Sequence, residues 1–214
     1  MKMGRILILG NSITRHSGLE GSGWELKDCG MAASAPEKDY VHLLLKRFTD
    51  AAGCQAPESL VENIAKFERE YDTYDVAGFF KRHAEFKPDI IIMAIGENVP
   101  PLETKEAKLN FHKAMTLLLK VLNQDSNSSI FVRSCFWEDK AKDDILRRVC
   151  EEAGGTFVSL VGVDKDKSNF AHSERTFSNV DVGNHPGDKG MKSIADVIWK
   201  AVENRRKRAT KQKS

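Results

Sequence analysis

Three polar residues far apart in the chain carry side chains that could together perform acyl transfer. Ser12 follows the glycine that ends an apolar run, Asn98 follows a second apolar run, and His185 lies in a long loop before the last predicted helix. A serine hydroxyl becomes a useful nucleophile when an imidazole accepts its proton, and the attacked carbonyl then needs N–H donors for its developing negative charge. These residue types therefore predict serine-based chemistry on an ester.

The segments that would position these residues alternate between strand and helix. Strand patterns cover 5–9, 58–65, 90–95, 129–135 and 156–161, and helical spacing covers 36–48, 71–86, 104–122, 139–153 and 188–204. This alternation predicts an α/β fold in which a mostly parallel, doubly wound sheet of about five strands lies between helices. Such sheets bind ligands at the carboxyl ends of their strands, which is where Ser12 and Asn98 would lie.

Local signals predict details of two helices. Ser34 precedes Pro36-Glu37 and is a plausible N-cap for the helix that follows. Thr104 is expected to cap the helix over 104–122, and Leu109 is expected among its inward-facing residues.

Composition restricts the class of protein. The chain has 214 residues, with 33 Lys and Arg against 31 Asp and Glu, which suits one domain and argues against an extended nucleic-acid face. Its four cysteines form no Cys-x-x-Cys pair, so zinc and redox motifs have no support. No apolar run approaches the roughly 18 residues of a membrane span, and we expect a cytoplasmic protein without membrane contact.

The end of the chain is basic. We expect residues 1–204 to form the domain and 205–214 to be a basic, solvated tail rather than a nucleic-acid arm. The histidines other than His185 show no partner at metal-ligand spacing, and the sequence predicts no metal site and no cofactor.

Four short motifs, in order along the chain, resemble the blocks of the SGNH (GDSL-type) esterase and lipase family. They are Gly10-Asn11-Ser12-Ile13, Gly30-Met31-Ala32-Ala33, Gly96-Glu97-Asn98 and His185-Pro186. The resemblance implies the SGNH hydrolase fold, a three-layer α/β/α sandwich with a flavodoxin-like sheet. No single block is specific, but their order on an alternating α/β chain strengthens the likeness.

The resemblance also implies a role for each matched residue. Ser12 would be the nucleophile and His185 its general base, while Asn98 Nδ2 and the main-chain N–H of Ser12 would line an oxyanion hole. The second block would add a further main-chain donor, which falls on Ala33 or, alternatively, on Gly30.

The sequence departs from the family pattern before the histidine. The family's acid lies three residues ahead of it, but Val182 occupies that position here and Asp181 lies one residue further back. A carboxylate that holds the imidazole tautomer is worth about 10⁴ in rate in serine proteases. We therefore expect the Asp181 carboxylate to orient His185, with a main-chain carbonyl and a Ser-His dyad as the alternative.

Several further residues could contact a substrate. Trp24 and Trp137 lie in loops expected at the carboxyl edge of the sheet, where aromatic walls often bound a pocket, although both could equally be packing residues. Glu97 could tune the charge of the site, and Arg133 could face an anionic group.

The resulting prediction is a serine esterase acting on a small-molecule carboxylic ester, with an O-acetyl group on a carbohydrate as the favoured substrate because members of the resembled family often act on these. A thioesterase or lysophospholipase on the same machinery is an alternative. A different class, a non-catalytic flavodoxin-like domain that binds an anion at the Gly10 to Thr14 turn, also fits a glycine-ended strand.

Overall fold

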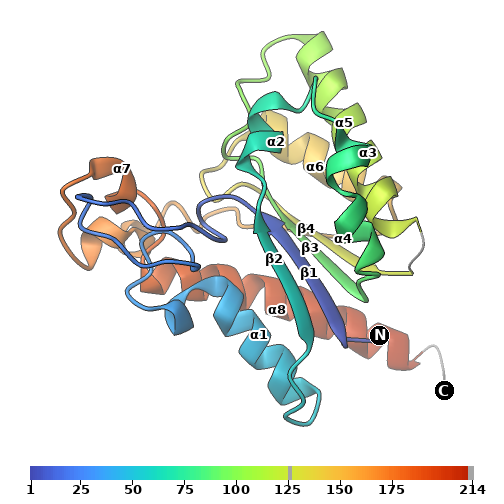
Figure 1. The fold of residues 1–214 in the computed structure, drawn as a ribbon, viewed down its shortest axis with the longest axis horizontal. Helices are drawn as coiled ribbons and strands as arrows, with labels where there is room; N and C mark the ends of the chain where they lie inside the picture. Colours follow the sequence, from blue (N-terminus) through green and yellow to red (C-terminus); the bar gives the residue numbers. More distant parts are fainter. Residues whose placement is uncertain (125–126, 212–214) are drawn as a thin grey trace.

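A parallel sheet lies between two helical layers in the computed structural model, which describes residues 1–124 and 127–211 (Figure 1). Its strands are β1 (Arg5–Gly10), β2 (Glu58–Asn63), β3 (Ile90–Ala94), β4 (Ser129–Arg133) and β5 (Thr156–Val158). Their order is β2-β1-β3-β4-β5, and every neighbouring pair is parallel. The predicted α/β sandwich with a five-stranded sheet is confirmed.

The central strands are apolar throughout because both of their faces are covered. Successive side chains of a strand point to opposite faces, so Leu7 and Met93 enter one hydrophobic core while Ile8 and Ile92 enter the other. The register pairs Gly10 of β1 with Ala94 of β3. The loops that follow these two strands therefore begin side by side at the carboxyl end of the sheet.

The helices form two unequal layers (Figure 1). One layer holds α1 (Tyr40–Ala51) and α8 (Asp188–Lys211). The other holds α2 (Ala65–Glu70), α3 (Val76–Phe79), α4 (Lys81–Glu85), α5 (Lys105–Asn123) and α6 (Lys140–Glu152). The short helix α7 (Val180–Gly183) and the 3₁₀ turns Pro36–Lys38, Lys167–Asn169 and Ala171–Ser173 belong to the connecting loops.

The helix caps only partly follow the prediction. Thr104 caps α5 as expected, its hydroxyl accepting from Ala107 N at 3.0 Å. The prediction for Ser34 was wrong, because α1 is capped by Asp39, whose carboxylate accepts from His42 N at 2.7 Å. Ser34 instead donates its N–H and hydroxyl to Asp188 at the start of α8.

Two helical predictions differ from the structure in the layer that contains α5. The single helix expected over 71–86 is a set of short helices, and α3 starts anew where the Asp75 carboxylate accepts from Gly78 N at 3.0 Å. Leu109 was expected to face inward but is 51% exposed. It lies nine residues before the buried Leu118, about two and a half turns, and so points to the opposite side of α5.

The last helix is longer than expected. It was predicted to end at residue 204, but α8 continues through the basic run to Lys211, so the expected boundary between domain and tail falls inside a helix. Residues 212–214 of that tail lie outside the described residues. Among the helices that the structure describes, none combines the length and the apolar character needed to cross a membrane.

Candidate active site

Ser12 is presented by a tight turn at the end of β1. A Cβ on Gly10 would lie 1.8 Å from Thr14 Oγ1 and 2.9 Å from the Ala94 carbonyl oxygen, so the turn requires glycine there. Asn11 holds the turn with its side chain, since its Oδ1 accepts from Ile13 N at 3.1 Å. Thr14 N donates to the Asn11 carbonyl at 2.9 Å. The Ser12 hydroxyl is thereby fixed at the carboxyl edge of the sheet.

Ser12 and His185 meet, although 173 positions separate them in the sequence. Ser12 Oγ lies 2.9 Å from His185 Nε2, and Nδ1 of the same ring lies 2.7 Å from the main-chain carbonyl oxygen of Asp181. A carbonyl oxygen only accepts hydrogen bonds, so Nδ1 carries the proton and donates it. Nε2 is then the unprotonated nitrogen, and its lone pair faces the serine hydroxyl. This is the tautomer that a general base requires.

The atom of Asp181 that orients His185 differs from the predicted one. The favoured prediction gave this task to its carboxylate, but the facing atom is its main-chain oxygen, and the residue is exposed. The reason is local: residues 180–183 form the helical turn α7, in which a carbonyl points toward the residue four positions later. Asn179 caps this turn by accepting from Asp181 N at 2.8 Å. The structure therefore shows the Ser-His dyad geometry that was the alternative.

The surroundings of His185 favour its neutral form. Burial lowers the pKa of His185, and this outweighs the opposite effects of the Asp181 carbonyl bond and the Glu97 charge. The ring of Trp137 meets the imidazole edge to face, with centroids 5.5 Å apart and planes at 88°. Of the predicted substrate contacts, Trp137 is the one placed beside the dyad.

Asn98 is held by a buried carboxylate that the sequence did not reveal. Glu68 on α2 accepts from Asn98 Nδ2 at 2.9 Å with one oxygen, and from Gly96 N at 2.6 Å and Asn98 N at 3.3 Å with the other. A side-chain amide has two N–H groups. One of them bonds Glu68, and the second makes no hydrogen bond to protein among the described residues.

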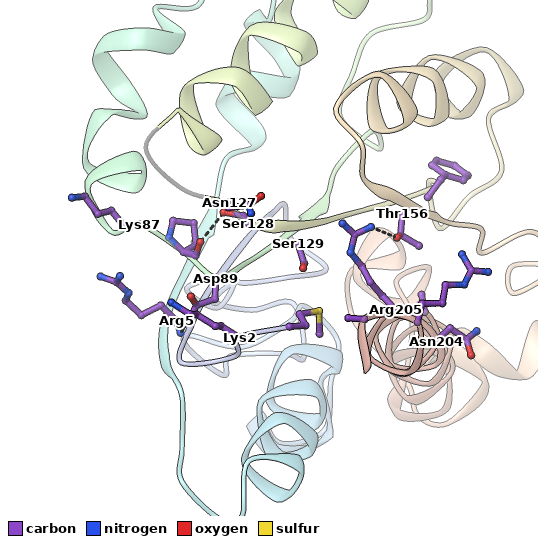
Figure 2. A pocket seen from close by; sticks show the side chains of 16 residues that line it. Lys2, Arg5, Lys87, Asp89, Asn127, Ser128, Ser129, Thr156, Asn204 and Arg205 are labelled. Carbon is purple, nitrogen blue, oxygen red and sulfur yellow. Dashed lines mark hydrogen bonds between the residues drawn. The ribbon is translucent and has the colours of Figure 1, made fainter. Parts of the chain in front are cut away.

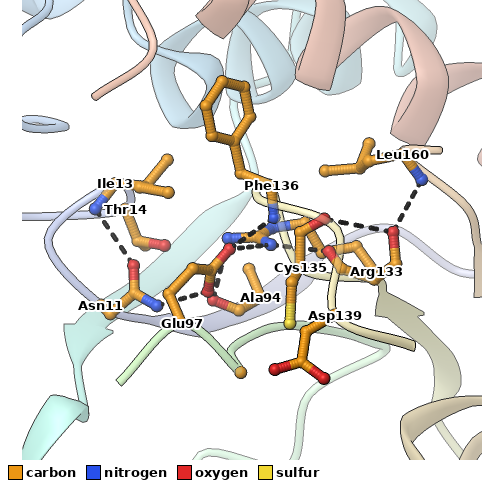
Figure 3. A network of polar contacts seen from close by, with 12 residues as sticks. Asn11, Ile13, Thr14, Ala94, Glu97, Arg133, Cys135, Phe136, Asp139 and Leu160 are labelled. Carbon is orange, nitrogen blue, oxygen red and sulfur yellow. Dashed lines mark hydrogen bonds and ion pairs between the residues drawn. The ribbon is translucent and has the colours of Figure 1, made fainter. Parts of the chain in front are cut away.

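A second carboxylate, that of Glu97, is buried and fully engaged (Figure 3). Its oxygens accept from Arg133 at 2.6 Å, from Phe136 N at 2.8 Å and from Asn11 Nδ2 at 2.7 Å. Its side chain is 4% exposed and that of Arg133 is 0% exposed. Burial alone would raise the pKa of Glu97, but the Arg133 charge and the hydrogen bonds outweigh it and lower that pKa.

Asn11 links the two carboxylates, which we call the carboxylate pair, Glu68 and Glu97. Its Nδ2 also lies 3.3 Å from Glu68 Oε1. Burial and the charge of Glu97 both raise the pKa of Glu68. The turn that carries Ser12 is thus connected through Asn11 and Glu68 to the loop that carries Asn98, so two of the predicted oxyanion donors share one hydrogen-bonded network.

The second motif, Gly30 to Ala33, does not offer the main-chain donor that the resemblance implied at Gly30 or Ala33. The N–H of Gly30 donates to the buried Asp39 carboxylate at 2.9 Å, which excludes Gly30 as a free donor. Ala33 N donates to the Gly30 carbonyl at 3.2 Å, so this donor is also occupied. Across the described residues, the main-chain N–H of Ser12 makes no hydrogen bond to protein. The two candidates of the second block, Gly30 and Ala33, are thus occupied, whereas the N–H of Ser12 is unoccupied among the described residues.

The remaining predicted contacts are structural. Trp24 is 4% exposed, and its Nε1 donates to the Ala33 carbonyl at 2.8 Å, so it anchors the second block rather than facing a substrate. Glu97 and Arg133 neutralise each other within the protein. Within the described residues, no group of three or more His, Cys, Asp and Glu side chains is arranged to hold a metal ion.

Sequence reasoning missed Glu68 and the side-chain role of Asn11. Asn11 could have been found, because a buried asparagine directly before the predicted nucleophile is well placed to build the turn. Glu68 lies in a charged stretch, Lys66 to Glu70, whose composition is typical of a solvated helix. Only the packing of α2 over the strand ends shows that Glu68 is buried.

Comparison with known proteins gave matches in structure alone; no family model and no curated protein matched the sequence. The chain is similar to proteins named as GDSL-like lipases from Bacteroides uniformis (TM-score 0.60, 18% identity, 94% of this chain and 96% of that one) and Bacteroides ovatus (0.56, 17%, 95% and 100%). It is also similar to an acetyl xylan esterase from the rumen bacterium Butyrivibrio proteoclasticus (0.54, 17%), covering 94% of this chain and 63% of that one. The fold predicted from the four motifs is confirmed: this chain has the fold of the SGNH (GDSL-type) hydrolases.

Proposed function

We propose that the protein is a serine esterase that cleaves a carboxylic ester through an acyl-serine intermediate. The observation that carries this proposal is the 2.9 Å contact between Ser12 Oγ and His185 Nε2, together with the bond that fixes the opposite ring nitrogen to the Asp181 carbonyl. Nucleophile and base lie within hydrogen-bond reach, and a third group orients the base, which is the arrangement that covalent catalysis needs.

The reaction follows from these contacts. Ser12 Oγ attacks the ester carbonyl carbon while His185 Nε2 takes the hydroxyl proton. The N–H of Ser12 and the free N–H of Asn98 Nδ2 bind the oxyanion. His185 then gives its proton to the departing alkoxide, which leaves as the alcohol. Water, deprotonated by His185, attacks the acyl-serine in the same way, and breakdown of this second intermediate releases the acid and returns the proton to Ser12.

A short acyl group on a carbohydrate is the substrate class that we propose. The fold is shared with an acetyl xylan esterase, and Trp137 stands directly beside the imidazole, where it would form a wall close to the acyl or alcohol group. The thioesterase and lysophospholipase alternative requires room for a long acyl chain, so the dependence of rate on chain length separates the two.

The anion-binding alternative is disfavoured by charge. Below the turn that carries Ser12, Asn11 contacts the carboxylate pair, and Arg133 is the cation paired with it among the described residues; both Glu97 and Arg133 are buried. A phosphate placed there would meet no uncompensated positive charge. A phosphate cradle also does not require an imidazole bonded to the serine hydroxyl, whereas a serine esterase does.

The proposal is tested with a series of p-nitrophenyl esters from acetate to octanoate. We expect the acetate to be hydrolysed fastest, and Ser12→Ala and His185→Ala to lower kcat by about 10⁴ or more. Ser17→Ala is the matched control, because Ser17 is an exposed serine of the same loop, and it should keep the full rate. Hydrolysis that survives in Ser12→Ala at the wild-type rate would overturn the proposal.

A further inference from the structure

A cavity of about 900 Å³ opens at the amino end of the sheet, away from Ser12 (Figure 2). It is lined by the residues that begin β1, β4 and β5, by the loop before β3, and by one face of α8. Arg5 and Gly10 stand at opposite ends of β1, so roughly 17 Å of strand separates this cavity from the turn that carries Ser12. It is a distinct region of the molecule.

Positive charge is concentrated in this cavity. Its lining includes Lys2, Arg5, Lys87, Arg205 and Arg208, and among the residues that the structure describes Asp89 is the carboxylate of that lining. The whole chain is nearly balanced, with a formal net charge of +2, so these groups are an enrichment and not a reflection of composition. Asp89 can offset one of these five charges, and its Oδ2 is held in place by the main-chain N–H groups of Gly4 and Arg5, which donate to it at 2.9 and 3.0 Å.

The cations come from several elements that converge. Ala201, Asn204, Arg205, Arg208 and Ala209 line the cavity from α8, and their spacing of three, four, seven and eight residues marks a single helix face. Basic residues in the last turn of a helix also complement its dipole. That effect accounts for Arg208, but not for Lys2, Arg5 and Lys87, which lie before β1, at its first residue and in the loop before β3.

The basic side chains of the cavity keep N–H donors available for a ligand. Among the described residues, the contacts of the Arg205 guanidinium are long, 3.3 Å to Thr156 Oγ1 and 3.5 Å to the Gly154 carbonyl, and Figure 2 shows this guanidinium beside Thr156. Among the described residues, Arg5, Lys87 and Arg208 form no ion pair with a carboxylate. Lys2, Arg5 and Lys87 form one basic wall of the cavity, and Arg205 and Arg208 form the other. Ser129 and Asn127 add polar groups to the lining. A compact ligand with several negative charges could therefore bridge both walls.

We propose that this cavity binds a small molecule carrying two or more phosphate groups. Guanidinium groups match phosphate oxygens in pairs, and charge-assisted hydrogen bonds of this kind are the strong ones. The concave shape favours a compact ligand over a nucleic-acid duplex, whose rigid backbone could not enter it. This site does not depend on the esterase proposal, since it shares no residue with the dyad.

The test is calorimetric titration of the full chain with inorganic tripolyphosphate, with ATP and with orthophosphate, at physiological salt. We expect saturable 1:1 binding of tripolyphosphate and ATP, and much weaker binding of orthophosphate. Equal affinities for the first two would assign recognition to the phosphates alone, while tighter ATP binding would add a nucleoside contact. Arg5→Gln and Arg205→Gln should each weaken binding about tenfold or more.

Lys207→Gln is the matched control. Lys207 is exposed on the same helix and carries the same charge, but it does not line the cavity, so its loss should change Kd by less than about twofold. Equal weakening by Lys207→Gln and Arg205→Gln, or no saturation at millimolar ligand, would overturn the proposal. So would tighter binding of a single-stranded 12-mer that tripolyphosphate cannot displace, because this would indicate an extended polyanion surface instead.

Discussion

The two ends of the sheet both hold arginine, but in opposite physical states. At the carboxyl end, Arg133 is 0% exposed and lies 2.6 Å from the Glu97 carboxylate. At the amino end, Arg5 and Lys87 are exposed around an open cavity, and their side chains form no ion pair within the described residues. The first arrangement uses the charge inside the protein, and the second presents it to solvent.

This difference shows what each end can do. A buried pair cannot attract an incoming anion, but it fixes the groups around it, and here Glu97 holds Phe136 N and Asn11 in place. Exposed cations impose little order on the protein, yet they remain available to a ligand. The carboxyl end is therefore suited to chemistry that needs fixed geometry, and the amino end to binding.

Stability gives the largest expected contrast between the two ends. Arg133→Met would leave Glu97 buried without its counter-charge, and we expect a loss of about 3–5 kcal/mol in the free energy of unfolding. Arg5→Gln removes an exposed charge and should change that free energy by less than about 0.5 kcal/mol. Urea unfolding at pH 7 measures both. Similar values for the two variants would mean that the Arg133–Glu97 pair is not the structural support described above.

The oxyanion support gives the next effect. Asn98→Ala should lower kcat by about 10²–10³, the usual cost of one donor in an oxyanion hole. Glu68→Gln should lower kcat by about tenfold or more with little change in KM, because an amide nitrogen would replace one of the oxygens that accept from Gly96 and Asn98.

A double variant tests whether Glu68 acts through Asn98. If it does, Asn98→Ala combined with Glu68→Gln should lose no more activity than Asn98→Ala alone, because the positioned group is already missing. Effects that multiply would assign Glu68 a separate role. Arg5→Gln, at the other end of the sheet, should leave kcat unchanged.

The pH dependence sharpens the description of the dyad. Burial lowers the pKa of His185 below its ordinary value of 6.5, and the base acts in its neutral form. The rate kcat/KM should therefore be at its plateau at neutral pH and fall, as pH decreases, with a midpoint below 6.5. A midpoint above 6.5 would contradict the structure, since it would indicate a carboxylate partner that stabilises the imidazolium.

The smallest effect is expected at Asp181. Asp181→Asn keeps the main-chain carbonyl that accepts from His185 Nδ1, so kcat should stay within about threefold of the wild-type value, in contrast to the loss of about 10⁴ that follows removal of a triad carboxylate. Steady-state kinetics at the pH plateau measures it. A loss approaching 10⁴ would restore the carboxylate to the mechanism.

Much of the fold could be predicted because its signals are local. Continuous apolar runs such as Ile90 to Ile95 mark strands covered on both faces, and the alternation with amphipathic helices gives a parallel sheet. The residues that follow β1 and β3 are then adjacent at the carboxyl end by topology alone. For the same reason the sequence could anticipate that the loops that carry Ser12 and Asn98 begin side by side. The order of the motifs added the prediction that His185 joins Ser12, and the structure brings these two side chains into contact.

The details of the active site and the cavity at the amino end of the sheet depend on contacts that no local sequence pattern encodes. Whether a carboxylate or a carbonyl faces His185 is decided by the helical turn of α7, which depends on the Asn179 cap and not on residue type at position 181. Burial of Glu68 depends on how α2 packs over the strand ends. The cavity at the amino end combines residues from both ends of the sequence, so the basic run at 205–208, considered by itself, resembles a solvated tail.

The most direct test of the central claim is labelling by a fluorophosphonate probe followed by mass spectrometry of the intact chain and its peptides. A hydroxyl activated by the imidazole should take up one phosphonyl group, at Ser12, and labelling should disappear in His185→Ala while Ser17→Ala labels normally. Failure of the wild-type chain to react, or labelling of Ser12 that persists at the same rate without the imidazole, would contradict a Ser12–His185 dyad.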